Sequence, residues 1–184
     1  MVHVRGVLVL NAVRFVRETF GPAQQQAVVD QLAPEWQAAF LVPLREVSWK
    51  PLELFVGYMD AARRLLAPQD ASFFRKLGAY AGRQERADSN FKIMVADPLT
   101  AMRLAPMVWR SFHDAGRLEV ERVNDRESLA RLYDFPPSVP MCERRCGAWQ
   151  ALLSGDELIA EVSETRCLRL GDACCETHTV WSPR

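Results

Sequence analysis

The sequence lacks a net charge. Its 184 residues include 23 lysines and arginines, which are balanced by 23 aspartates and glutamates. A broad cationic field draws proteins to nucleic acids and to anionic membranes, so this balance argues against nucleic acid as a partner. The charged fraction of 25% and the aromatic fraction of 9% are ordinary for globular proteins, which argues against a disordered chain.

The sequence also lacks a long hydrophobic run. The apolar stretch at residues 6–13 is interrupted by Asn11 and followed by Arg14 and Arg17. It is too short to span a bilayer, and no small-residue cleavage pattern follows it. We therefore expect a cytoplasmic protein with no membrane span. The odd cysteine count of five then favours reduced thiols or metal ligation over disulfides.

The common catalytic motifs are missing as well. There is no phosphate-binding loop, no glycine-rich dinucleotide fingerprint and no GxSxG elbow. The three histidines, His3, His113 and His178, lie far apart in the sequence. Cys174 or Cys175 could pair with His178 as a nucleophile, but this pair has no recognisable orienting group. We expect a protein that is not an enzyme.

Hydrophobic periodicity predicts helices in the first two thirds of the chain. Apolar residues recur at steps of three and four, and the predicted helices cover residues 9–20, 23–32, 34–41, 52–66, 73–81 and 97–113. Gly21-Pro22 is a typical helix end, and Asp97-Pro98 is a typical helix start with an N-cap aspartate. The apolar stripes indicate core-facing helices.

After Gly116 the apolar period changes to two. The pattern predicts a hairpin over residues 118–135, a helix over 141–153 and a second hairpin over 158–181. We predict a single α+β domain over residues 1–184. In it, an N-terminal helical layer packs on a C-terminal antiparallel sheet built from two hairpins separated by a helix.

The cysteines gather near the C-terminus. Glu164, Cys167 and Cys175 fall around the turn of the second predicted hairpin, and Cys142 or Cys146 on the preceding helix could complete a tetrahedral site. Thiolates and a carboxylate suit a structural zinc ion. The spacing is not the specific CxxC…CxxC pattern, and reduced cysteines are also ordinary small core residues, so both interpretations stay open on spacing alone.

The run at residues 164–175, ETRCLRLGDACC, resembles the ETxCxxxGDxxC signature of 4-vinyl reductase domains. These belong to a superfamily that includes heme nitric-oxide-binding sensors and the TRAPP subunits of Golgi transport. The wider chain resembles a protein family best known from myxobacteria. That likeness rests on residues 7–21, 48–51, 109–110, 116–120 and 133–136.

The resemblance implies a small-molecule-binding or regulatory α+β domain, and it implies a zinc ion held by three cysteines and one glutamate. The matching positions are Cys142, Glu164, Cys167 and Cys175, with Cys146 or Cys174 as substitutes for Cys142. Heme is expected to be unlikely, because no match to the heme family's contact motif surrounds His113.

These observations favour a non-enzymatic sensory or signalling domain that binds a small hydrophobic ligand, with a structural zinc site. We expect the ligand between helices and sheet, with Trp109, Phe112, Tyr133 and Trp149 as lining residues, although such residues are more often ordinary core. The alternative is a TRAPP-like interaction adaptor without a ligand, which would use an apolar surface to form a homodimer or to bind a partner protein.

Overall fold

The computed structural model describes residues 1–87 and 97–184. It combines helices with two antiparallel sheets, one of two strands and one of four. The N-terminal elements are β1 (His3–Arg5), α1 (Gly6–Phe20), α2 (Pro22–Asp30), α3 (Pro34–Gln37), η1 (Ala38–Phe40), β2 (Trp49–Pro51), α4 (Leu52–Leu66) and α5 (Phe73–Ala87). The C-terminal elements are α7 (Pro98–Phe112), β3 (Arg117–Asn124), β4 (Glu127–Tyr133), α8 (Val139–Leu153), β5 (Leu158–Arg166), η2 (Leu168–Leu170) and β6 (Cys175–Pro183).

The α+β class predicted from the sequence is confirmed. Both predicted hairpins are present, as β3–β4 and β5–β6, with α8 between them in the chain. Pairing of β4 with β6 joins the hairpins into one sheet of order β3-β4-β6-β5. The two-stranded sheet of β1 and β2 was not predicted, because strands of three residues are too short to show a period.

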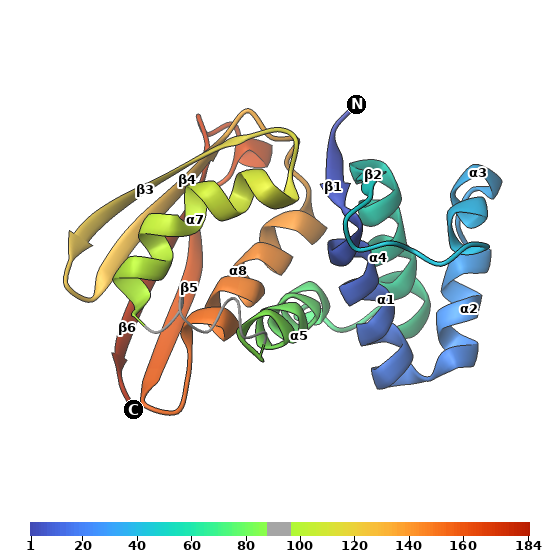
Figure 1. Cartoon of the computed structure of the whole chain (residues 1–184), viewed down its shortest axis with the longest axis horizontal. Coiled ribbons are helices and arrows are strands. Elements are labelled where there is room, and N and C mark those ends of the chain that lie inside the picture. Colours follow the sequence, from blue (N-terminus) through green and yellow to red (C-terminus); the bar gives the residue numbers. More distant parts are fainter. Residues whose placement is uncertain (88–96) are drawn as a thin grey trace.

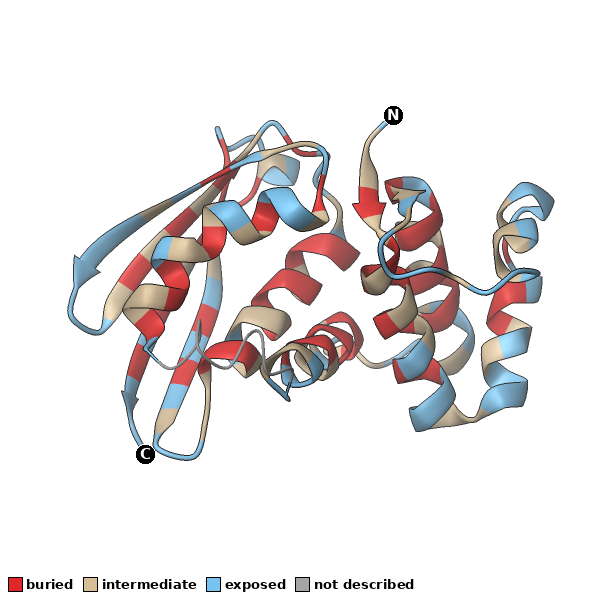
Figure 2. Ribbon diagram, viewed as in Figure 1, coloured by how far each residue is buried: buried red, intermediate tan, exposed pale blue. Residues whose placement is uncertain are grey.

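The packing of the helices differs from the predicted layer. The sheet packs against α7 and α8, whereas α1, α2 and α4 form a separate helical group that contacts the rest of the molecule chiefly through α5 and α8 (Figure 1). Buried residues therefore occur along most of α8, which lies between α5 and the sheet, and on the inward sides of α1 and α4 (Figure 2).

Glycines allow α5 and α8 to approach until their backbones touch. A Cβ atom at Gly78 of α5 would lie 2.0 Å from the carbonyl oxygen of Arg144, and one at Gly147 of α8 would lie 2.1 Å from that of Arg75. Only residues without a side chain fit at such a distance. This contact fixes α8, and with it Cys142, Arg144 and Arg145, against the rest of the fold.

Within the two described ranges, no helix is long and apolar enough to cross a membrane.

Candidate functional site

Four residues distant in sequence meet at the end of the second hairpin. Cys142 lies in the first turn of α8, Glu164 near the end of β5, Cys167 just after β5, and Cys175 at the start of β6. One ligand atom from each lies within 4.8 Å of the others. We call these four residues the thiol cluster. The structure thus brings together the four residues predicted as metal ligands, while Cys146 and Cys174 are buried outside the cluster.

The hairpin turn positions the cluster. The register of β5 against β6 shifts between Glu164 and Arg166, and Gly171 takes a positive φ of 92° that suits glycine. Asp172 Oδ2 then accepts a hydrogen bond of 2.7 Å from the backbone nitrogen of Cys167. The backbone nitrogen of Leu168 donates to Cys175 Sγ at 3.4 Å. The turn therefore holds Cys167 and Cys175 beside each other.

The sulfur positions suit tetrahedral coordination. Cys142 Sγ and Cys167 Sγ are 3.8 Å apart, and Cys167 Sγ and Cys175 Sγ are 3.9 Å apart. Around a tetrahedral ion with metal–sulfur bonds of about 2.3 Å, two sulfurs are separated by about 3.8 Å. Glu164 Oε1 is buried without a hydrogen-bond partner, and its ion pair with Arg145 Nη2 is long, at 3.9 Å, so this oxygen can serve as a ligand. Sulfur and oxygen atoms in this arrangement can bind one thiophilic divalent cation.

Burial keeps the thiols of Cys142 and Cys175 protonated when no cation is present. It raises the pKa of Cys142, with a further contribution from the Glu164 carboxylate, and it also raises the pKa of Cys175. A cation must therefore displace protons to bind, which makes its affinity fall at low pH.

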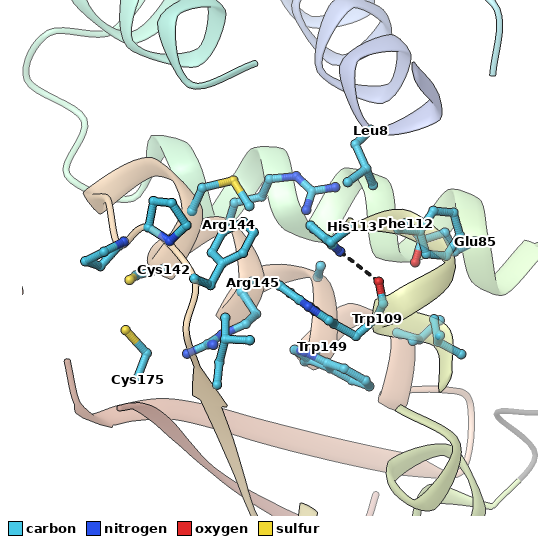
Figure 3. Close-up of a pocket in the computed structure, with 18 residues that line it drawn as sticks. Leu8, Glu85, Trp109, Phe112, His113, Cys142, Arg144, Arg145, Trp149 and Cys175 are labelled. Atoms are coloured by element: carbon cyan, nitrogen blue, oxygen red, sulfur yellow. Dashed lines mark hydrogen bonds between the residues drawn. The ribbon is translucent and has the colours of Figure 1, made fainter. Parts of the chain in front are cut away.

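A pocket lies beside the cluster, between α7, α8 and β4 (Figure 3). Its cavity volume is about 80 Å³. Of the predicted ligand-binding residues, Trp109, Phe112 and Trp149 line it. Tyr133 does not, and the guanidinium of Arg117 lies 4.4 Å from the centre of its ring. Cys142 and Cys175 of the thiol cluster also line the pocket, so the two features share a wall.

His113 is the most distinctive residue of the pocket, and the sequence interpretation gave it no role. It follows the last residue of α7, and its ring stacks on Trp109 with centroids 3.6 Å apart and an angle of 6° between planes. Its Nδ1 lies 3.1 Å from the carbonyl oxygen of Trp109 (Figure 3). Since a carbonyl can only accept, Nδ1 carries the hydrogen and Nε2 presents a lone pair.

The environment keeps this imidazole neutral. Burial lowers the pKa of His113 to about 3, and Nε2 is buried without a partner. A neutral histidine whose second nitrogen donates to a backbone carbonyl is the usual form of a metal-ligating histidine. Nε2 can therefore bind a metal or accept a hydrogen bond from a ligand.

Two buried arginines complete the pocket. Arg144 and Arg145 of α8 line it, and each residue is only 6% exposed. Nε and Nη2 of both side chains are buried without hydrogen-bond partners. The sequence gives no signal for this, because adjacent arginines on a helix normally indicate a solvent-exposed face.

Comparisons with known proteins show which solved structures have a similar fold. No family model and no curated protein sequence matches the chain. Similar solved structures include an unliganded Fe(II) H-NOX protein from K. algicida, with 11% identity over 98% of this chain and 97% of that chain and a TM-score of 0.72. An H-NOX protein from S. oneidensis in the Fe(II)NO state has 11% identity over 97% and 99% of the two chains and a TM-score of 0.73. The H-NOX domain from Shewanella oneidensis in the Fe(II)CO state has 13% identity over 95% and 97%, with a TM-score of 0.70.

Two expectations from the sequence are corrected by these comparisons. The resemblance to 4-vinyl reductase domains is wrong as an assignment, because these structures are H-NOX proteins, and a signature of twelve residues describes one hairpin turn rather than the whole fold. The expectation that heme is unlikely is also wrong, since similar structures concern heme in the H-NOX family. None of these comparisons shows zinc or supports the TRAPP-like adaptor. At 8–13% identity, the likeness shows that this chain has the H-NOX fold.

Proposed function

We propose that residues 1–184 form a single, non-enzymatic sensory domain that binds heme in the pocket beside His113. The observation that carries the proposal is the buried, neutral imidazole of His113. Its Nε2 has no hydrogen-bond partner, and the residue borders an aromatic-lined cavity. The H-NOX proteins of similar fold in Fe(II), Fe(II)NO and Fe(II)CO states support it.

The residues of the pocket fit heme in their chemistry. A histidine nitrogen is a common axial ligand of heme iron, and the side chains of Trp109 and Trp149 provide flat apolar walls. The cavity of about 80 Å³ is smaller than the roughly 300–1,000 Å³ of typical ligand sites. Binding of a porphyrin therefore requires the walls on α7 and α8 to move apart.

The chain's own residues would prepare the site. The carbonyl of Trp109 fixes the tautomer of His113, and the rings of Trp109 and Phe135 fix its orientation, the latter with a centroid 5.6 Å away at 87°. The apolar walls exclude water. When bound, heme would supply an iron with a coordination position for a small ligand such as a diatomic gas. Movement of α8, which contacts α5 and β5, would pass the change to the rest of the domain and to a partner.

Hemin titration tests this proposal. We expect the wild-type protein to form a one-to-one complex with a sharp Soret band, and His113→Ala to lose that band or bind hemin at least tenfold more weakly, with recovery on addition of imidazole. His178→Ala is the matched control, because His178 lies on β6 and pairs with Glu127. Equal hemin spectra and affinities for wild type and His113→Ala would contradict the role of His113.

A smaller apolar ligand without iron is the second candidate occupant, and the cavity volume of about 80 Å³ favours it. If this candidate is correct, small aromatic ligands should raise the melting temperature of the protein. Any binding of hemin should then not depend on His113.

We also propose that the thiol cluster holds one thiophilic divalent cation that stabilises the hairpin end against α8. Sulfur–sulfur distances of 3.8 and 3.9 Å and the buried Glu164 oxygen, which makes no hydrogen bond, support this proposal. Cobalt(II) is a suitable probe, because its thiolate complexes absorb in the near ultraviolet and visible range. We expect one equivalent to bind wild type and Cys146→Ser, whose altered residue lies outside the cluster, but not Cys167→Ser. Equal cobalt spectra in the two variants would exclude the cluster as the binding site.

A further inference from the structure

Arg144 and Arg145 are unusual because they are buried cations with unused hydrogen-bond donors. Nε and Nη2 of both side chains are buried without partners, and both residues line the pocket. Arginine stays protonated in proteins, so neither side chain can avoid the cost of burial by losing its proton. A buried charge without a partner is strongly unfavourable.

The neighbouring acidic residues do not satisfy these two side chains. Glu85 is the acidic group that faces Arg144, but no ion pair within 4.0 Å joins them in the described part of the chain, and burial raises the pKa of Glu85. Glu164 Oε1 lies 3.9 Å from Arg145 Nη2, beyond hydrogen-bond distance. Glu164 also faces Arg169 at 3.8 Å and belongs to the thiol cluster.

Apolar contacts surround these donors. The guanidinium of Arg144 lies 5.2 Å from the centre of the Phe55 ring, and the pocket wall beyond it carries Trp109 and Trp149. The side chains that line the pocket therefore include both flat apolar rings and guanidinium N–H groups without hydrogen-bond partners. Planar carboxylates match guanidinium groups with paired hydrogen bonds.

We infer that the occupant of this pocket is an apolar, aromatic molecule that carries a carboxylate, and that Arg144 and Arg145 bind the carboxylate while Trp109 and Trp149 contact the apolar part. The inference rests on the proposed function in one respect, namely that the pocket binds a ligand. Heme, which carries two carboxylates, and a free aromatic carboxylic acid share this chemistry.

Paired probes test the inference. Isothermal titration would compare 2-naphthoate with 2-naphthamide, and hemin with its dimethyl ester, on the wild-type protein. Each pair differs in the carboxylate charge but keeps the aromatic body. A hydrogen bond to a charged group contributes about 1.5–3 kcal/mol, or roughly tenfold or more in affinity. We expect the acid of at least one pair to bind that much more tightly than its neutral partner. The pair with the higher affinity identifies the source of the carboxylate.

Arg144→Met and Arg145→Met give a second readout. Each should reduce the preference for the acid by about tenfold with little effect on the neutral probe. Arg144→Met should also raise the melting temperature of the ligand-free protein, because a buried charge without an ion pair is removed. Arg110→Met is the control, since Arg110 is exposed on α7. A purely structural role for Arg144 would lower the melting temperature instead.

The outcomes separate the inference from the proposed function. If acid and neutral probes bind equally to the wild-type protein, the carboxylate inference is wrong and a ligand pocket remains. If no probe binds, both the ligand pocket and the inference fail. If the methionine variants keep the preference for the acid, Arg144 and Arg145 are not its ligands and the inference is overturned.

Discussion

Among single residues, Asp97 shows how one side chain fixes the start of the helix that leads to His113. Its Oδ2 accepts a hydrogen bond of 2.8 Å from the backbone nitrogen of Thr100, and Pro98 occupies the first helical position. An N-cap aspartate satisfies a backbone donor that the helix itself leaves free. The Asp97-Pro98 pair in the sequence predicted this start, and the structure confirms it.

We predict that Asp97→Ala lowers the free energy of unfolding by about 1 kcal/mol, because the amide of Thr100 loses its partner. Asp97→Asn keeps an accepting oxygen and should stay within a few tenths of a kcal/mol of the wild type. Urea unfolding followed by circular dichroism at neutral pH measures both differences. Equal losses in the two variants would mean that charge, and not capping, determines the contribution of Asp97.

The site residues differ in how far the sequence reveals them. The thiol cluster could be predicted, because a hairpin turn necessarily brings Glu164, Cys167 and Cys175 close together. His113 could not, since a single histidine on a helix gives no sign that its Nε2 borders a cavity. Arg144 and Arg145 are buried by contacts of α8 with both α5 and the sheet, and such contacts depend on the complete fold.

At the level of elements, the direct backbone contact between α5 and α8 determines where the pocket wall lies. We predict that Gly78→Ala and Gly147→Ala each lower the free energy of unfolding by about 1–3 kcal/mol, because the new methyl groups would force the helices apart. At both positions the atom that a Cβ would meet, at 2.0 and 2.1 Å, is a backbone oxygen that cannot swing aside.

Gly57→Ala is the matched control for these two glycines. Gly57 is also helical, within α4, but a Cβ there would meet no atom within 4 Å. This change should stabilise the protein by up to about 1 kcal/mol, because alanine has the higher helix propensity. Thermal and urea unfolding of the three variants measures these differences. A stabilised Gly78→Ala variant would contradict the close approach of α5 and α8.

Element boundaries were predictable where the apolar period is long. The helix predicted at 52–66 has the bounds of α4, and the helix predicted at 9–20 ends with α1, although α1 begins earlier, at Gly6. Several turns of one apolar stripe determine the type of a helix better than its first residue. The elements that cover the sheet were not predictable. The apolar stripe of a helix shows that it packs against something, but it does not identify α7 and α8 as the helices that do so.

Across the whole molecule, the thiol cluster and the pocket beside His113 share a wall. Cys142 and Cys175 belong to both, and Arg145 lies between the pocket and Glu164. A divalent cation that displaces the thiol protons would leave the cluster with one more negative charge than before, because three thiolates and the Glu164 carboxylate outweigh the charge of the cation. That charge would hold the guanidinium of Arg145, which lies 3.9 Å from Glu164, and would repel a carboxylate in the pocket. The two binding events should therefore oppose each other.

We predict that one equivalent of cobalt(II) weakens the binding of 2-naphthoate to the wild-type protein by roughly fivefold or more, the lower end of typical coupling between sites. Because coupling is reciprocal, saturating 2-naphthoate should weaken cobalt(II) binding by the same factor. In Cys167→Ser, which alters the cluster but not a residue of the pocket wall, cobalt(II) should leave the affinity for 2-naphthoate unchanged. Isothermal titration in both orders measures the two factors. Equal affinities with and without cobalt(II) in the wild-type protein would show that the two sites are independent despite their shared wall.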